Sequence, residues 1–372
     1  SGGCAGLGVI CNSSQKARGA TGLNPPTGDA FYIDYVAHEI GHQFGGDHTF
    51  NGTAGSCNGN RVSSSAYEPG SGSTIMAYAG ICGAQDLQPH SDAYFHARSL
   101  LQIANVVTAT SCAAFITLNN QAPVAGSPPN YTIPISTPFM LTAIASDPDN
   151  DSLSYCWEEY DLESTSTEPP TSNDTDGPMF RSYNPTVSPI RYFPKISDIV
   201  GNTSTQWEVL PSVSRTMHYR MTVRDYHNLA GCTDEDDVVV TTSSTSGPFT
   251  VTSQNAATSW PEGSTQTVTW NVANTTASPV SCANVDIRLS YDGGYTYPTA
   301  LSLNEPNDGS ANVTIPPGTT TTARVMVRGS NNIFFDINNV NITIEPGVPN
   351  FTISLNPASV TECNVGSVST SV

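Results

Sequence analysis

The sequence predicts a multidomain protein in which an α+β region is followed by two all-β sandwiches. The chain has 372 residues, which is enough for two to four domains of ordinary size. Apolar residues recur at helical spacing only within residues 1–118. Beyond that point they alternate with polar residues, as expected for strands that bury one face.

Two segments of the first region have a helical pattern. The first runs from about Asp34 to Phe44, with Asp34 as the expected N-cap and a Gly-Gly pair as the expected stop. The second is "SDAYFHARSLLQIANVV", which we expect to begin at a cap formed by Ser91 or Asp92. Ahead of both, "AGLGVI" predicts a short strand over residues 5–10.

A linker containing proline and glycine, "NNQAPVAGSPPN", ends this region. We therefore predict four units: 1–118, a sandwich over 119–246, a second sandwich over 247–346, and 347–372 as the start of a further, truncated domain. The alternating apolar positions are Leu153, Tyr155 and Trp157, then Tyr219, Met221 and Val223 in the first sandwich, and Val268, Trp270, Val272, Val285, Ile287, Leu289, Tyr291, Val340, Ile342 and Ile344 in the second.

Composition excludes several classes of partner. The formal charge is −19 with only 13 Lys plus Arg, which argues against binding to nucleic acid or to an anionic membrane. No apolar run reaches the roughly 18 residues that a membrane span requires. Nine cysteines without a Cys-x-x-Cys pair indicate disulfides in an oxidising compartment, and hence a secreted, extracellular protein. Nine is odd, and Cys363 is the candidate without a partner.

The stretch "HEIGHQFGGDH", residues 38–48, has the spacing of a metal-hydrolysis site. His38 and His42 are four residues apart and therefore share one helical face. Gly45 permits an abrupt end to the helix, so that His48 can return to the same ion. Three neutral imidazoles and one water make a zinc site with an open position. Glu39 would accept the proton of the zinc-activated water, whose pKa zinc lowers to roughly 7, as it attacks a carbonyl.

The pattern His-Glu-x-x-His-x-x-Gly-x-x-His resembles the signature of the metzincin clan of zinc endopeptidases. That clan also has a methionine-containing turn beneath the zinc, and "STIMAYAG" supplies one at Met76. The combination is most similar to reprolysin-like, adamalysin-type secreted bacterial metallopeptidases with C-terminal β-sandwich modules. The resemblance implies that the three histidines bind Zn²⁺, that Glu39 is the general base and that Met76 forms the floor of the site. Tyr78 matches a tyrosine that in some branches reaches the zinc or the reacting oxyanion.

The resemblance covers about residues 30–112. It implies that residues 1–118 form the C-terminal half of a catalytic domain, with zinc helix, Met-turn and C-terminal helix, while most of the N-terminal subdomain is missing. "CAGLGVI" would be the last part of that subdomain, an edge strand along which substrate aligns by β-addition. Thr49 follows the third histidine, where adamalysins have Asp and astacins have Glu, and His-Thr-Phe at 48–50 resembles pappalysins.

Six cysteines can be grouped by position, although the pairings remain open because four cysteines allow three connectivities. One pair would staple the Met-turn region, a second would join the two ends of the first region, and a third lies within the first predicted sandwich. These pairs are Cys57 with Cys82, Cys11 with Cys112, and Cys156 with Cys232.

The segment "SDPDNDSLSY" places Asp147, Asp149 and Asp151 at alternate positions before a strand. Carboxylates so spaced could share a Ca²⁺, and similar turns occur in cadherin-like modules. The alternative is a solvated Asx/Pro turn that needs no ion. We favour the turn, because a bidentate Glu and the EF-hand Gly are both absent. We expect the first sandwich to be cadherin/PKD-like and the second to be Ig/FnIII-like.

Two functions of different classes follow. The first is a secreted zinc metalloendopeptidase that hydrolyses peptide bonds in protein or peptide substrates. The second is an adhesive or binding protein whose sandwiches carry the function and whose zinc domain is vestigial or inactive. Intact Glu39 argues against the second, since a site that only holds zinc has no need of that carboxylate. A combination is also open, in which the sandwiches attach the enzyme to an extracellular polymer or a cell-surface ligand.

Overall fold

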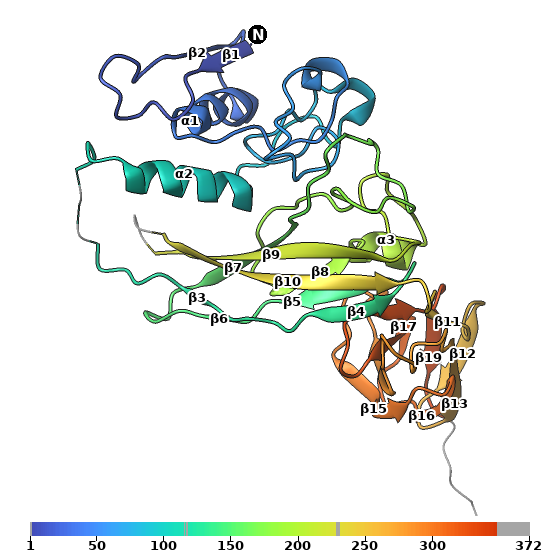
Figure 1. Cartoon of the computed structure of the whole chain (residues 1–372). Helices are drawn as coiled ribbons and strands as arrows, with labels where there is room; N and C mark the ends of the chain where they lie inside the picture. The colour runs from blue at the N-terminus through green and yellow to red at the C-terminus, as the bar shows by residue number, and fades with distance from the viewer. Residues whose placement is uncertain (1, 115, 117, 228–230, 348–372) are drawn as a thin grey trace, which may run out of the picture.

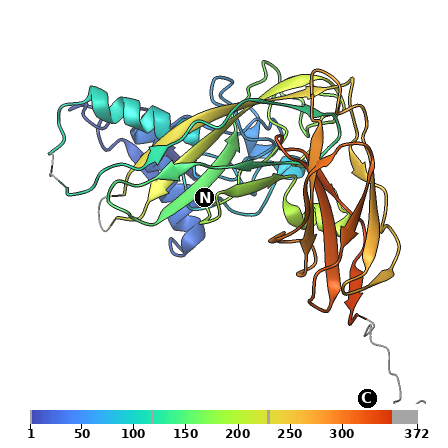
Figure 2. The same ribbon diagram turned by 90° about the horizontal axis from the view of Figure 1, so that it is seen from below.

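The computed structural model describes residues 2–114, 116, 118–227 and 231–347. It is mostly β-sandwich with few helices (Figure 1). An N-terminal region packs on one side of a first sandwich, and a second sandwich projects from that sandwich at an angle (Figures 1 and 2). Most of the predicted further domain, from residue 348 onward, and Cys363 with it, lie outside the described residues. Within those residues, no helix combines the length and apolar character that crossing a bilayer demands.

The N-terminal region contains one small sheet and several helical segments. Its elements are β1 (Gly2–Ala5), paired antiparallel with β2 (Gly19–Gly22), the π-helix η1 (Phe31–Ala37), α1 (His38–Gln43), the 3-10 turns η2 (Gly55–Cys57) and η3 (Gly83–Gln85), and α2 (Ala97–Ala109).

The first helix begins earlier than the sequence predicts. Ala30 already has helical angles, so Asp34 lies inside the helix and is not its N-cap. The Asp34 carboxylate instead accepts hydrogen bonds from the Ser91 N–H at 2.8 Å and from His90 Nδ1 at 2.8 Å. A tertiary contact therefore uses the side chain that local sequence assigns to a cap.

The second helix begins later than predicted, at Ala97. The preceding residues are held out of the helix, because the Asp92 N–H donates to Ser73 O and the Ile75 N–H donates to Tyr94 O. The His96 side chain then accepts from the Arg98 N–H and caps the helix. The strand predicted over residues 5–10 is also displaced, to Gly2–Ala5.

The first sandwich is built from short strands and one short helix. Its elements are β3 (Val124–Ala125), β4 (Tyr131–Pro134), β5 (Phe139–Thr142), β6 (Ala145–Ser146), β7 (Leu153–Glu159), β8 (Ile190–Phe193), α3 (Ile196–Gly201), β9 (Arg215–Asp225) and β10 (Thr233–Ser243). One sheet has the order β4-β10-β9-β7, while β5 pairs with β8 and β3 pairs with β6.

The alternation predicted for β7 and β9 places apolar side chains on the core face. Trp157 pairs with Met221 and Tyr155 with Val223 in an antiparallel register, and Met221 and Val223 are fully buried. The opposite face of this sheet is only partly solvated: α2 lies over part of it (Figure 1), while His218, Glu235 and Asp237 are exposed. Glu158, on that face, has an exposed fraction of 0%.

In the second sandwich, a three-stranded sheet faces a larger sheet. Its strands are β11 (Thr250–Val251), β12 (Thr258–Pro261), β13 (Thr265–Asn271), β14 (Asn284–Ser290), β15 (Thr299–Pro306), β16 (Ser310–Thr314), β17 (Thr320–Gly329), β18 (Phe335–Ile337) and β19 (Ile342–Glu345). The sheet orders are β11-β13-β16 and β12-β19-β17-β14-β15, with β18 paired to β17.

The two sandwiches are joined by direct backbone contacts. The Met140 N–H donates to Ile333 O at 3.0 Å, and the Phe335 N–H donates to Pro138 O at 2.9 Å. Their buried apolar residues form one continuous cluster. The connection is therefore a packed interface and not a single linker strand, while the unit boundaries given above remain predictions.

Candidate metal centre

The three histidines of the motif come together through a helix and the turn that ends it. His38 and His42 lie on one face of α1. Gly45 has a φ of +92°, a conformation that side chains with a Cβ resist, and it redirects the chain so that His48 approaches the same point. A Cβ on Gly45 would also lie 2.5 Å from Val106 Cγ2 of α2. Glycine is therefore required here both for the turn and for the close packing of α2.

The imidazole rings are oriented by backbone carbonyls. The Nδ1 atoms of His38, His42 and His48 each lie 2.7 Å from a carbonyl oxygen. Each Nδ1 therefore carries the proton, and each Nε2 presents a lone pair. These carbonyls belong to Ile75, Gly46 and Asn60.

The three Nε2 atoms converge. His42 Nε2 lies 3.1 Å from both His38 Nε2 and His48 Nε2. Three lone pairs facing one another without a proton repel, unless a cation lies between them. Tetrahedral zinc with Zn–N bonds of 2.0–2.1 Å separates its nitrogen ligands by about 3.3 Å, so the donor set fits a zinc ion.

Burial keeps the rings neutral. It lowers the pKa of His38 to about 3 and that of His48 to about 4, and it also lowers the pKa of His42. The neighbouring imidazoles lower the pKa of His38 further. Neutral imidazole is the form that binds a metal ion, and these rings have that form throughout the neutral range.

Glu39 lies beside this triad in an open cleft of about 320 Å³, which also contains His42, His48 and Tyr78. The Glu39 side chain passes directly under strand β1, where a Cβ on Gly3 would lie 2.0 Å from Glu39 Oε1. Its Oε2 is buried and has no hydrogen-bond partner among the described residues. Burial raises the pKa of this carboxyl.

Met76 and Tyr78 both lie at the triad. Met76 is fully buried, and its sulfur packs against the backbone of α1 at Gly41, where a Cβ would lie only 2.3 Å from Sδ. The Tyr78 ring lies 4.5 Å from the ring of His48 and 5.6 Å from that of His38. Burial and the charge of Glu39 raise the pKa of Tyr78, so it stays protonated.

Glu68 is a buried residue that no motif in the sequence identifies, and it ties the segment before Met76 to the residue after the third histidine. Its carboxylate accepts hydrogen bonds from the Thr49 hydroxyl at 2.5 Å, from the Thr74 hydroxyl at 2.6 Å and from the Ser73 N–H at 2.9 Å. Glu68 is fully buried. A sequence signal was present, because Glu68 is the only Asp or Glu between His48 and Asp86, in a stretch rich in hydroxyl side chains.

Two further contacts hold the segment around His48. Gln102 of α2 accepts from the Asp47 N–H at 3.0 Å and donates to Asp47 Oδ2 at 2.7 Å. Asn51 donates from Nδ2 to Glu163 at 2.5 Å and to Glu168 at 2.8 Å, and both of these glutamates belong to the first sandwich. The loop that presents the third histidine is therefore supported from two sides.

The structure contains the Cys11–Cys112 and Cys57–Cys82 disulfides, two of the pairings that the sequence left open. The expected Cys156–Cys232 pair is wrong. Cys156 lies opposite Thr222 in the β7–β9 ladder, whereas the Cys232 carbonyl accepts from Asp225, three residues along β9. Three strand residues span about 10 Å, more than a disulfide can bridge. The Cys156 thiol instead donates to Tyr183 O.

Asp147, Asp149 and Asp151 are brought within 4.8 Å of one another. Asp147 Oδ1 accepts from the N–H groups of Asp149 and Asp151, which is the geometry of an Asx turn. Asp149 also accepts from Gln121, and Asp151 pairs with His227 at 2.7 Å. Asp147 Oδ2 is buried without a hydrogen-bond partner among the described residues, so both the calcium site and the turn that needs no ion remain predictions.

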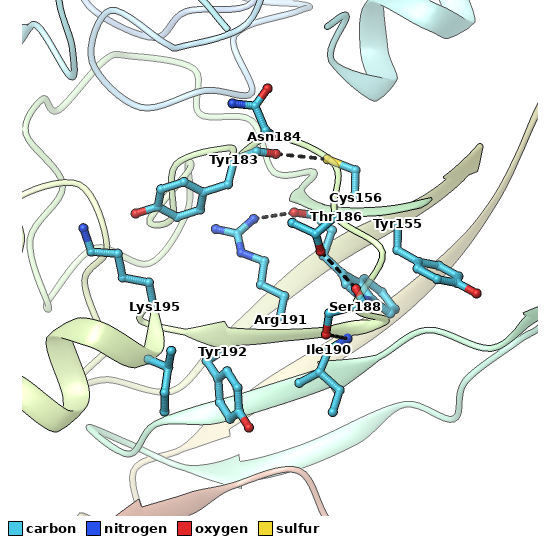
Figure 3. Close-up of a pocket in the computed structure, with 12 residues that line it drawn as sticks. Tyr155, Cys156, Tyr183, Asn184, Thr186, Ser188, Ile190, Arg191, Tyr192 and Lys195 are labelled. Atoms are coloured by element: carbon cyan, nitrogen blue, oxygen red, sulfur yellow. Dashed lines mark hydrogen bonds between the residues drawn. The ribbon is translucent and has the colours of Figure 1, made fainter. Parts of the chain in front are cut away.

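A separate cavity of about 170 Å³ lies between β7 and β8 (Figure 3). The Arg191 guanidinium fills part of it, donates to the carbonyls of Trp157 and Arg181, and pairs with Glu208 at 3.2 Å. Arg191 Nε has no hydrogen-bond partner among the described residues, but both terminal nitrogens of the guanidinium are held by these groups, so we assign the cavity a structural role.

Comparisons with known proteins support the N-terminal assignment. Residues 1–98 match the family described as metallo-peptidase family M12B, reprolysin-like, so this segment is reprolysin-like. No curated protein matches the chain.

Solved structures that match the chain include three multidomain β-proteins. The tandem Ig repeats of Dlar are 12% identical, with 60% of this chain and 98% of that one covered and a TM-score of 0.31. A Bacteroides ovatus mixed-linkage glucan protein, SGBP-B, is 13% identical, with 61% and 48% covered and a TM-score of 0.17. Drosophila N-cadherin EC1-4 is 11% identical, with 62% and 51% covered and a TM-score of 0.22. At these scores the likenesses carry no argument about function.

Proposed function

We propose that this chain is a secreted zinc-dependent metalloendopeptidase that hydrolyses peptide bonds in proteins. The observation that carries the proposal is the convergence of three neutral imidazole Nε2 atoms, with His42 Nε2 at 3.1 Å from each of the other two, beside an open cleft that contains a carboxylate. The reprolysin-like match over residues 1–98 supports the same reaction class. The two disulfides are compatible with an extracellular location.

His38, His42 and His48 would hold the zinc ion. Bound there, zinc would supply Lewis-acid activation of water and of the scissile carbonyl at neutral pH. Glu39 would take the proton of the attacking water on a carboxylate oxygen and then deliver it to the leaving amine. Its buried Oε2 lacks a protein partner among the described residues, which leaves this oxygen available for that proton.

Tyr78 would stabilise charge on the reacting oxygen. Its ring lies against His48 in the same cleft as Glu39, and a protonated phenol donates a hydrogen bond to a developing oxyanion. β1 forms one wall of the cleft through Gly3, Cys4 and Ala5. An extended substrate would pair with this strand and so present its backbone carbonyl to the site.

The test compares the wild-type chain with Glu39→Gln for bound zinc and for hydrolysis of casein. We expect both proteins to bind about one zinc, and we expect only the wild type to cleave, with Glu39→Gln slower by about 10²-fold or more. Zinc binding without cleavage by the wild type would instead favour the binding protein with an inactive zinc domain. Absence of bound zinc in both proteins would reject the metal site itself.

A further inference from the structure

A groove of about 410 Å³ lies where the two sandwiches meet, far along the chain from the metal centre. One wall is the β5–β8 ribbon of the first sandwich, and the other is formed by β14, β17 and the loop before β15. Nothing in the proposed peptidase reaction uses this groove. Its lining is unusual in a chain of net charge −19, because it contains two arginines and three tyrosines.

Strand register shows that side chains line the groove. Met140 pairs with Tyr192, and Thr142 pairs with Ile190, so these four residues share one face of the ribbon. On the other wall, Arg288 pairs with Met326, and the neighbouring pair on that face is Asp286 with Arg328. A ligand there meets side-chain faces and not the N–H and C=O groups of a strand edge. The groove is therefore poorly suited to an extended peptide, which binds by adding a strand.

Arg288 forms no ion pair with any carboxylate of the described residues. Its Nη1 donates only a long hydrogen bond, 3.4 Å, to Tyr297 O. Its Nε is buried without a hydrogen-bond partner, and among the described residues no carboxylate forms an ion pair with it. The nearby Asp286 is taken by Arg328, which donates to it at 3.0 and 3.2 Å. Burial and the charge of Arg328 lower the pKa of Arg288, while the charge of Asp286 raises it; the attraction of a bound anion would favour the charged guanidinium.

The groove also offers aromatic surface and is preformed. Tyr295 is 51% exposed at its edge, whereas the hydroxyl of Tyr297 is buried beside Gly294 and does not face the ligand. Behind the groove, Met140 and Tyr192 pack on the buried cluster that contains Met326 and Phe335. Because the two sandwiches are fixed to each other in this way, little conformational freedom is lost when a ligand binds.

We propose that this groove binds a uronic-acid residue of an acidic polysaccharide. Arg288 pairs with the sugar carboxylate through its planar guanidinium. The exposed Tyr295 ring covers the apolar face of the sugar. The sandwiches would then attach the protein to an anionic polymer, whether or not the metal centre is active.

The test measures binding of trigalacturonate to the whole chain by calorimetry in about 150 mM salt, with maltotriose as the uncharged probe. We expect trigalacturonate alone to bind. Arg288→Gln should weaken its binding about tenfold or more, because a charge-assisted bidentate pair is lost. Arg288→Lys should fall in between, and Tyr295→Ala should weaken binding severalfold. Arg18→Gln is the matched control, because Arg18 is exposed and distant in sequence.

Several results would overturn the proposal. They are failure of the wild type to bind trigalacturonate, equal loss in Arg288→Gln and Arg18→Gln, and binding of maltotriose as tightly as trigalacturonate. If pentaglutamate binds equally well and is equally sensitive to Arg288, the groove recognises acidic peptides and not uronates. Thermal melting of each variant controls for folding, and Tyr295→Ala keeps the test decisive if Arg288→Gln does not fold.

Discussion

Replacing Glu68 tests whether a buried carboxylate holds the metal centre together. Glu68→Ala removes the acceptor for the Ser73 and Thr74 N–H groups, which lie 2.9 and 3.2 Å from Oε1. Both donors then remain buried without a partner. At about 1–3 kcal/mol for each orphaned donor, we expect the free energy of unfolding to fall by about 2–6 kcal/mol.

Glu68→Gln separates hydrogen bonding from charge. The amide oxygen can still accept from both N–H groups, and the amide NH₂ can donate to the hydroxyls of Thr49 and Thr74, which now accept. Only the extra strength of charge-assisted hydrogen bonds is lost, so we expect the free energy of unfolding to decrease by about 1–2 kcal/mol. Zinc affinity should fall about 10–100-fold in Glu68→Ala, as for other residues that orient metal ligands, because Thr49 follows His48 directly.

The assays are urea unfolding of the zinc-loaded protein and zinc competition with a chelator. Glu345→Ala is the control, since Glu345 is exposed on β19. If Glu68→Ala unfolds at the same urea concentration as Glu345→Ala and binds zinc equally well, the carboxylate does not hold the Met-turn and the reasoning fails.

Two other predictions follow from close packing and from burial. Gly41→Ala places a Cβ 2.3 Å from Met76 Sδ, so we expect a lower melting temperature and a free energy of unfolding reduced by about 1–2 kcal/mol, because overpacking outweighs the gain in helix propensity. Gly22→Ala is the control, since its Cβ meets no atom within 4 Å, and it should melt like the wild type. Equal melting of the two variants would contradict the packing argument. Burial raises the pKa of Glu168 from an ordinary value of 4.5 to about 7, so the folded state binds this proton more tightly than the unfolded chain does, and the resulting stability is lost as pH rises from about 4.5 through about 7. Urea midpoints between pH 5 and 8.5 should therefore decline less in Glu168→Gln than in the wild type, whereas Glu345→Gln should leave the decline unchanged; an identical slope in Glu168→Gln would show that the Glu168 carboxyl is not responsible.

Features set by local spacing could be predicted from the sequence. His38 and His42 share a helical face because they are four residues apart. The helix ends at Gly45 because glycine adopts a positive φ more easily than other residues do. The alternation of Tyr219, Met221 and Val223 likewise assigns one face of β9 to the core, and all three side chains are fully buried.

Features set by contacts between distant segments could not be predicted. The start of α2 depends on backbone pairing between residues 73–75 and 92–94, which overrides a favourable Ser-Asp cap. Cys156 and Cys232 share a sandwich, but they lie on opposite sides of β9 and at different levels along it. The role of Glu68 depends on hydroxyl and amide groups at positions 49, 73 and 74, and only the three-dimensional fold shows that these groups converge.

The first sandwich supports the metal centre through a chain of direct contacts. Glu158 of β7 accepts from the Ala97 N–H at 2.8 Å and so places a carboxylate at the N-terminus of α2, where negative charge is favourable. From the same helix, Gln102 binds both the N–H and the carboxylate of Asp47, the residue before His48. A sandwich that acted as a spacer would expose the outer face of β7, yet Glu158 is completely buried there. The position of His48 therefore depends on the first sandwich, because Glu158 of that sandwich binds the N-terminus of α2, and α2 orients the loop that carries His48.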